Sequence, residues 1–311
     1  MARPLAYARG LVSDPNRDRE EADLAPGCAR LLAEQNPDGG WGYRGGASWT
    51  EPAAYALLAL EGLPEAGPAS DRARRWLAGN QRHDGGFAPR PSVEESTWVT
   101  ALAVLSGAAT GDPGRRAVEW LLSESGEEST FLFRLRSWMN NTRPQAMAEG
   151  LPGWSWYPGT AAWVVPTSLT MLALEKAEHL YPDPRIRRRI DQGRRFLLAH
   201  RCEDGGWNHG SIRALGFQSV SYPETTGIAL LALHDPGPTP LQKSIARAEE
   251  HYRNCRSLEG LSWLQLGLMA QGRPAPAPVA DVPARTLLDT ALAILAGRAR
   301  QGRNVFLEAA R

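Results

Sequence analysis

The sequence predicts an all-α protein, an α/α toroid in which an inner ring of helices is wrapped by an outer ring. Charged amphipathic stretches alternate along the chain with stretches that are apolar on every side, and a helix that is apolar all round is typically buried. A short Asp-Gly-Gly-aromatic segment lies between the two kinds of stretch at residues 35–41, 81–87 and 201–207. A two-helix unit therefore repeats along the chain, which predicts an α6/α6 barrel.

The amphipathic stretches are predicted to form the outer helices. Several of them follow a proline, an Asp or a Ser, as helix N-termini commonly do. Their ranges are Pro26–Gln35, Ser70–Gln81, Asp112–Ser123, Asp183–His200 and Pro240–Arg256.

The apolar stretches are predicted to form the inner helices, and Arg285–Ala296 is expected to complete or cap the ring. Their ranges are Pro52–Leu60, Ser96–Leu105, Pro166–Leu174, Thr225–Leu233 and Leu261–Ala270.

The inner helices share a register. Counting back nine residues from their last leucine gives Glu51, Val165 and Glu224, and an alignment on Thr97 gives Glu95. A Glu at a helix N-terminus is stabilised by the helix dipole by ~0.3–1 kcal/mol. The simplest interpretation of these glutamates is that they cap helices.

The three Asp-Gly-Gly segments are expected to be equivalent turns that join an outer to an inner helix. A Gly after the last helical turn stops the helix in the left-handed conformation. The side chains of Asp38, Asp84 and Asp204 can accept hydrogen bonds from nearby backbone N–H groups. Positive φ angles are expected at Gly40 and Gly206, so that valine at either position would destabilise the protein.

Composition narrows the classes of function. The chain has 35 basic and 34 acidic residues, and this balance argues against nucleic acid as a partner. Three cysteines, an odd number, indicate free thiols and a reducing compartment. No signal peptide is recognised at the N-terminus, and no apolar run reaches the ~20 residues of a membrane helix. We expect a cytoplasmic protein and leave its oligomeric state open.

The predicted organisation is an N-terminal extension over residues 1–20, the toroid over 21–297 and a C-terminal tail over 298–311. Residues 125–160 and the Pro-rich run 271–283 are longer than the other connections. Long connections on a rigid scaffold often carry function.

The Gln-x-x-Asp-Gly-Gly-aromatic elements resemble the QW motifs of triterpene cyclases (squalene–hopene and oxidosqualene cyclases) and of the related protein prenyltransferase β-subunits. The resemblance extends from about Pro26 to Ala296. Residues 153–156, Gly-Trp-Ser-Trp, and 205–210 are most similar to the single-domain bacterial repeat proteins of this superfamily. A full triterpene cyclase has two such toroids. The resemblance implies a terpene cyclase-like or prenyltransferase-like protein with a central cavity for an isoprenoid or other apolar substrate.

Class II cyclases protonate an alkene with the middle Asp of an Asp-x-Asp-Asp-Thr motif. When Thr97 is aligned with the family's Thr, that Asp falls on Glu95, whereas Val93 and Ser96 replace its two companions. The resemblance therefore implies Glu95, with the adjacent Glu94, as the candidate acid, on the first turn of an inner helix and facing the cavity.

The Asp-x-Asp-Asp, Asp-Asp-x-x-Asp and Asp-x-Cys motifs of the superfamily are absent. We therefore expect no metal site and no cofactor. The nearest zinc-type group is His200, Cys202, Asp204 and His209, whose spacing matches no known site.

Eleven tryptophans are more than expected, and most lie outside the repeated turns. In cyclases such aromatic side chains line the cavity and stabilise carbocations. Packing between the two rings is the alternative explanation. The candidate substrate-binding residues are Trp49, Trp98, Trp138, Trp156, Trp163 and Tyr222.

Two other functions remain open at this point. The first is a non-catalytic toroid that binds an apolar ligand or a protein partner. The second is a carbohydrate-active α/α-barrel enzyme, because such barrels also carry paired carboxylates for glycoside hydrolysis. Glu94, Glu95, Glu149 and Glu224 are available for such a pair.

Overall fold

The computed structural model describes residues 15–126, 151–210, 213–214, 217–235, 237–274, 276 and 282–308. Eleven α-helices are present in this part of the chain. The strands there are β1 (Arg213–Ala214) and β2 (Phe217–Gln218), which pair with each other antiparallel. A 3-10 turn, η1 (Pro64–Ala66), precedes α3. The all-α prediction is confirmed.

Six helices form a closed inner ring. Each packs against the next around the ring in the order α2, α4, α7, α9, α11 and α12, and α12 packs against α2. They are α2 (Thr50–Leu60), α4 (Val99–Leu105), α7 (Val164–Glu178), α9 (Pro223–Ala232), α11 (Leu258–Ala270) and α12 (Leu287–Arg300). The α/α toroid is confirmed, and the predicted last helix completes the inner ring.

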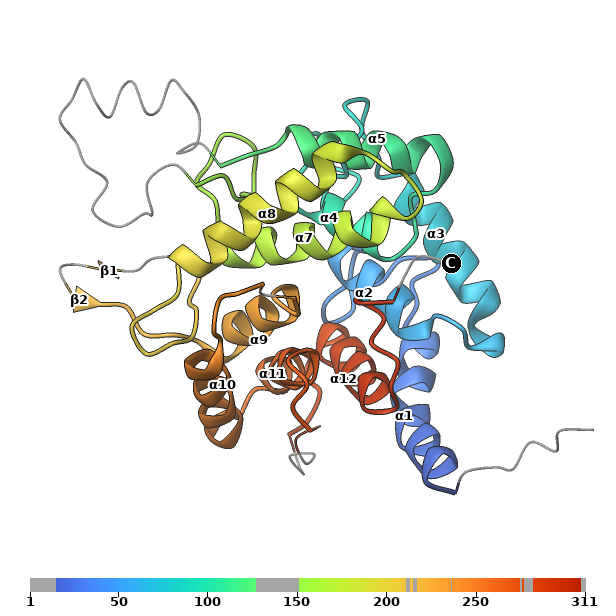
Figure 1. Cartoon of the computed structure of the whole chain (residues 1–311). Coiled ribbons are helices and arrows are strands. Elements are labelled where there is room, and N and C mark those ends of the chain that lie inside the picture. Colours follow the sequence, from blue (N-terminus) through green and yellow to red (C-terminus); the bar gives the residue numbers. More distant parts are fainter. Residues whose placement is uncertain are drawn as a thin grey trace, which may run out of the picture.

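The remaining helices surround this ring, with α5 at the top of Figure 1, α3 at the right and α10 at the lower left. They are α1 (Pro15–Ala33), α3 (Gly67–Ala78), α5 (Gly111–Ser123), α8 (Pro184–Ala199) and α10 (Gln242–Asn254). No outer helix lies in the described residues between α11 and α12. The predicted domain boundaries stay a prediction.

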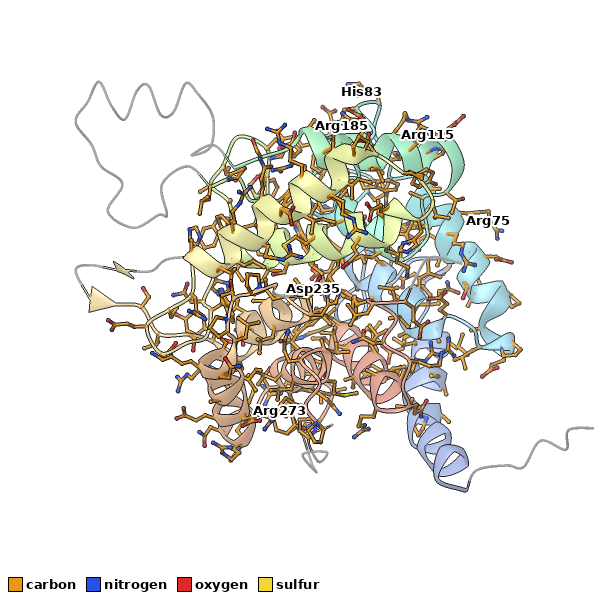
Figure 2. All side chains as sticks on the ribbon, in the orientation of Figure 1. Arg75, His83, Arg115, Arg185, Asp235 and Arg273 are labelled. Atoms are coloured by element: carbon orange, nitrogen blue, oxygen red, sulfur yellow. The ribbon has the colours of Figure 1, made fainter. Side chains whose placement is uncertain are left out.

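The two rings differ in polarity as expected from the sequence. From Pro52 to Leu60, every residue of α2 is buried. On the outer helices, Arg75, Arg115 and Arg185 are exposed and lie at the outer edge of the molecule in Figure 2. The core therefore lies between the rings and among the inner helices.

The three Asp-Gly-Gly turns have the same hydrogen bonds. Each aspartate accepts the backbone N–H of the second glycine, at 3.0 Å for Asp38, 3.0 Å for Asp84 and 3.1 Å for Asp204. Each also accepts a hydroxyl hydrogen bond from a serine near the start of the next inner helix. These donors are Ser48, Ser96 and Ser221, at 2.7, 2.7 and 2.8 Å. The expected equivalence of the turns is confirmed.

The aromatic residue of each turn covers the end of the preceding helix. Trp41, Phe87 and Trp207 are fully buried. The indole N–H of Trp41 donates to the Leu31 carbonyl at 2.8 Å, and that of Trp207 donates to the Leu197 carbonyl at 2.6 Å.

The two glycines of the turn differ from the prediction in which of them has the positive φ angle. The positive φ belongs to the first glycine, at 97° in Gly39 and 100° in Gly205. The expectation of a positive φ at Gly40 and Gly206 is therefore wrong. The second glycine is needed for space, because a Cβ on Gly40 would lie 2.5 Å from the Cβ of Ser48.

Within the described residues, no helix is long and apolar enough to cross a membrane.

Gly40→Ala should lower the free energy of unfolding by ~1–3 kcal/mol, because the added methyl group overpacks a buried contact. Urea denaturation measures this loss. Gly67→Ala is the matched control, since a Cβ there meets nothing within 4 Å. Equal stability of the two variants would show that the close approach to Ser48 is not a constraint.

Candidate functional site

The N-terminal ends of the inner helices surround a cavity of about 210 Å³. Five of the six inner helices contribute to its wall, together with Trp98, which directly precedes α4, and two loop residues. The lining residues are Glu51, Tyr55, Trp98, Trp156, Val165, His209, Glu224, Ile228, Glu259, Trp263, Leu288 and Leu292. The cavity is the best candidate for a functional site in the described part of the chain.

Three glutamates reach the cavity from the same position on three helices. Glu51, Glu224 and Glu259 are each the second residue of their helix, α2, α9 and α11 respectively. Val165 and Leu288 hold this position on α7 and α12. The parallel ring therefore brings together carboxyl groups that lie up to about two hundred residues apart in the sequence.

At the start of α4 the equivalent position belongs to Trp98, the residue just before the helix. The hydroxyls of Thr100, Thr167 and Thr226 each accept the backbone N–H of the aromatic residue in the preceding segment. Trp98, Val165 and Glu224 lie two residues before these threonines, in the same order. A tryptophan thus takes the place that a glutamate has on α2, α9 and α11.

Glu95 lies elsewhere. The helix α4 begins at Val99, so the expectation that Glu95 is on the first turn of an inner helix is wrong. Glu94 and Glu95 are exposed in the preceding loop, and neither lines the central cavity. The alignment on Thr97 failed because Thr100, not Thr97, binds the preceding turn with its hydroxyl. A catalytic role for either residue stays a prediction.

The environment of Glu51 and Glu259 favours their neutral forms. Burial raises the pKa of Glu51, and the hydroxyl of Tyr43, which donates a hydrogen bond to Glu51, partly opposes this. The pKa of Glu259 is raised to about 7. Burial is the largest cause, and the charges of Glu224, Glu51 and Asp289 are the others. A carboxyl group with this pKa can give or accept a proton near neutral pH.

Aromatic rings form much of the remaining wall. Trp98 and Trp156 pack edge to face with their ring centroids 4.7 Å apart. On the other side, Trp263 meets Tyr55 at 5.9 Å. The predicted residues Trp98 and Trp156 therefore line the cavity.

The other predicted aromatic residues lie around it. Trp49, Trp163 and Tyr222 each precede an inner helix directly and are not part of the lining. Trp163 and Tyr222 flank His209, with ring centroids at 6.3 and 5.4 Å. Trp138 lies outside the described residues.

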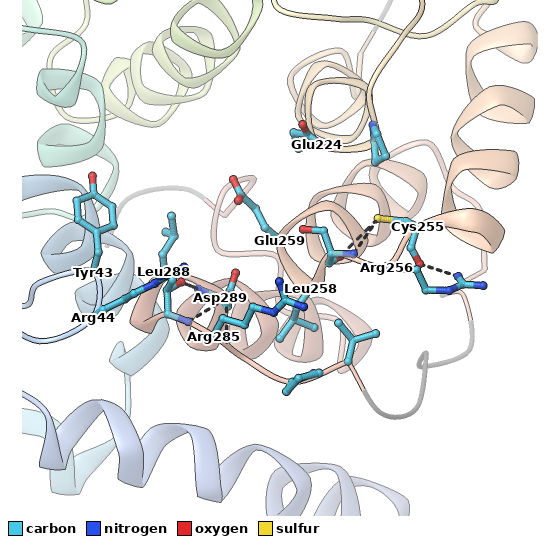
Figure 3. Close-up of a pocket in the computed structure, with 15 residues that line it drawn as sticks. Tyr43, Arg44, Glu224, Cys255, Arg256, Leu258, Glu259, Arg285, Leu288 and Asp289 are labelled. Carbon is cyan, nitrogen blue, oxygen red and sulfur yellow. Dashed lines mark hydrogen bonds between the residues drawn. The ribbon is translucent and has the colours of Figure 1, made fainter.

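A wider pocket of about 550 Å³ shares Glu224, Glu259 and Leu288 with the central cavity and forms its mouth. Figure 3 shows this pocket, with Glu259 between Glu224 and Tyr43.

Three arginines, Arg44, Arg256 and Arg285, also line the mouth. None of these arginines has an ion-pair partner among the described residues. The entrance thus carries these three arginines together with Glu224, Glu259 and Asp289, whereas the cavity itself has no arginine or lysine in its lining.

No group of three or more His, Cys, Asp or Glu side chains is arranged to hold a metal ion in the described residues. In the zinc-type group, His200 donates its Nδ1–H to the Phe196 carbonyl at 2.8 Å, and His209 faces the cavity. Cys202 is a buried free thiol, as are Cys28 and Cys255.

Sequence reasoning missed Glu259, Tyr43 and Tyr55, and it considered His209 in a zinc-type group and not at the cavity. Glu259 had a usable signal, because counting back nine residues from Leu268 gives this position. The tyrosines and the histidine had none, since only the closed ring brings them to the cavity.

No family model matches the chain. Among curated proteins, the squalene–hopene cyclase of Bradyrhizobium diazoefficiens is 25% identical over 264 residues, which are 78% of this chain and 38% of that protein. A probable squalene–hopene cyclase of Sinorhizobium fredii is 26% identical over 68% of this chain and 33% of that protein. Drimenyl diphosphate synthase of Streptomyces showdoensis is 45% identical over 94 residues, 29% of this chain and 17% of that protein.

This chain is a homologue of squalene–hopene and other terpene cyclases. It spans 17% to 38% of the length of these curated relatives.

Solved structures agree on the fold. The type II terpene cyclase MstE from Scytonema superposes with a TM-score of 0.53 at 16% identity, over 93% of this chain and 79% of that one. The endo-β-1,4-glucanase CMCax from Acetobacter xylinum superposes with a TM-score of 0.57 at 16% identity, over 90% of this chain and 99% of that one. One toroid thus serves two chemistries among these proteins.

The raised pKa of Glu259 predicts how stability changes with pH. Between its ordinary pKa of 4.5 and about 7, the folded protein binds more protons at this site than the unfolded chain does. The free energy of unfolding contributed by Glu259 therefore decreases as pH rises through this window. In Glu259→Gln, urea denaturation from pH 4 to pH 8 should show a weaker decrease than in the wild type. Glu203→Gln, at an exposed residue, should leave the decrease as it is. An unchanged pH profile in Glu259→Gln would rule out a neutral Glu259.

Proposed function

We propose that the toroid catalyses an acid-initiated reaction of an isoprenoid in its central cavity. The observation that carries this proposal is the arrangement of Glu51, Glu224 and Glu259 at one position of three inner helices, around a cavity otherwise lined mainly by aromatic and aliphatic groups. No arginine or lysine is among these lining residues. Such a wall suits a ligand that is apolar and becomes positively charged.

Glu259 is the proposed proton donor. With a pKa of about 7, a substantial fraction of its carboxyl groups is protonated at neutral pH. The N-terminus of α11 favours the ionised form by about 0.3–1 kcal/mol, which is less than one pKa unit. Burial and the neighbouring carboxylates outweigh this effect.

In the proposed step, the O–H bond of Glu259 breaks and its proton forms a C–H bond with one carbon of an alkene. The other alkene carbon becomes a carbocation. The faces of Trp98, Trp156 and Trp263 stabilise this cation by cation–π attraction, each by about 0.5–2 kcal/mol. The charge of Glu224 adds to the stabilisation, and loss of a proton to a carboxylate ends the reaction.

The mouth suggests which isoprenoids to test. Arg44, Arg256 and Arg285 suit the anionic head group of a prenyl diphosphate, and drimenyl diphosphate synthase is among the relatives. Squalene, without a head group, is the other class, because squalene–hopene cyclases are also relatives.

The decisive experiment is turnover of squalene, farnesyl diphosphate and geranylgeranyl diphosphate, with products identified by mass spectrometry. Glu259→Gln should lower kcat by at least about a hundredfold, the usual contribution of a general acid. Glu95→Gln is the control and should retain activity, because Glu95 is exposed in a loop.

The opposite result, loss of activity in Glu95→Gln alone, would place the acid in that loop and refute the proposal. Calorimetric binding of N,N-dimethyldodecylamine, compared with dodecanol, tests the cavity without turnover. The charged amine should bind more tightly, and Glu224→Gln should reduce the difference. If the amine binds but no isoprenoid is converted, the toroid is a binding protein.

A glycoside hydrolase is the second candidate. It is favoured by the fold likeness to the glucanase and by the presence of three carboxyl groups around one cavity. Release of reducing sugar from carboxymethyl cellulose, lost in Glu259→Gln, would support it over the isoprenoid reaction.

A further inference from the structure

The chain closes the far end of its own ring. After α12, the segment Gln301–Glu308 (the closing segment) runs back toward the middle of the ring, as the red trace in Figure 1 shows. Lys176, near the C-terminal end of α7, donates to the Val305 carbonyl at 3.3 Å. The N–H of Arg303 donates to the Arg298 carbonyl at 2.9 Å. The ring is therefore open where its helices begin and covered where they end.

Two apolar side chains of the closing segment are inserted into the core. Val305 and Phe306 are each only 2% exposed. The side chain of Asn304 accepts the backbone N–H of Phe306 at 3.2 Å, which fixes the turn that presents it. Phe306 is thus held in place by local hydrogen bonds as well as by packing.

Phe306 lies directly behind the floor of the central cavity. Its ring centroid is 5.6 Å from that of Trp263, and Trp263 is 5.9 Å from Tyr55. Trp263 and Tyr55 both line the cavity, whereas Phe306 does not. The Phe306 ring therefore blocks movement of Trp263 away from the cavity.

We propose that Phe306, acting through Trp263, sets the depth of the cavity and hence the length of the apolar chain that it accepts. This proposal rests on the proposed function, since it takes the central cavity as the binding site of an apolar chain. The cavity of about 210 Å³ is smaller than most ligand sites, which measure about 300–1,000 Å³. In so small a cavity, the depth determines how much of a linear ligand can enter. Phe306 is a specificity-determining residue and does not touch the reacting atoms.

The experiment measures the binding of octyl-, dodecyl- and hexadecyl-dimethylamine by isothermal titration calorimetry. Each methylene that enters the cavity should raise the affinity about fourfold, until the chain reaches the floor. In the wild type the affinity should stop increasing beyond a certain length of the alkyl chain. In Phe306→Ala the gain should continue to a longer chain, because Trp263 can move into the vacated space.

Val305→Ala is the matched control. Val305 is as buried as Phe306 in the same segment, but it has no aromatic ring, whereas the ring of Phe306 packs on Trp263. It should keep the length limit of the wild type. Phe306→Leu retains most of the packing and should shift the limit in the same direction by less, which covers the case that Phe306→Ala does not fold.

Three results separate the two proposals. If the wild type binds these amines and the Phe306 variants keep its length limit, the role of Phe306 is refuted while the proposed function stands. A shift in Val305→Ala equal to that in Phe306→Ala also refutes it, because the effect would then be general loosening. If the wild type binds none of the amines, the cavity is not a site for a cationic chain and both proposals fail.

Discussion

A hydrogen bond between a serine hydroxyl and an aspartate fixes each Asp-Gly-Gly turn to the start of the inner helix that follows. In the third turn, Ser221 donates to Asp204 at 2.8 Å, and Asp204 also accepts the N–H of Gly206 at 3.1 Å. The turn and the helix entrance are thus one rigid piece, packed so closely that no Cβ fits on Gly206. The first turn of the inner helix can then face the axis in only one register.

The site follows from this register. Because the inner helices share this register, the second residue of a helix reaches the cavity, and Glu51, Glu224 and Glu259 occupy this position on three of them. Like charges at short range oppose each other, so their convergence costs stability unless protons are bound. The scaffold holds them together because its own stability comes from contacts elsewhere, in the turns and between the rings. A functional site that opposes folding is a common compromise.

The sequence predicted the fold well because its signals are local. Helix periodicity and the turn residues lie within a few positions of each other, and the ring follows from their repetition. The site was predicted only in part. Trp98 and Trp156 were found, but Glu95 was misplaced. Each of α4, α7 and α9 is held to the preceding aromatic residue by two hydrogen bonds, one to its carbonyl from a backbone N–H and one from its N–H to a threonine hydroxyl. The two bonded residues at the start of α4 are one position closer together in the sequence than those of α7 and α9. The shared register gives Glu51 and Glu259 separately, but their meeting in one cavity depends on closure of the ring.

The closing segment also matters for the acid. A toroid open at both ends would admit water along its axis, and a hydrated Glu259 would titrate near its ordinary value of 4.5. Val305 and Phe306 are buried at the far end, whereas the mouth reaches Glu259 from the other side. Burial is the largest cause of the raised pKa of Glu259. The segment that limits the depth of the cavity therefore also helps to keep its proposed proton donor neutral, and the two properties are coupled through one buried phenylalanine.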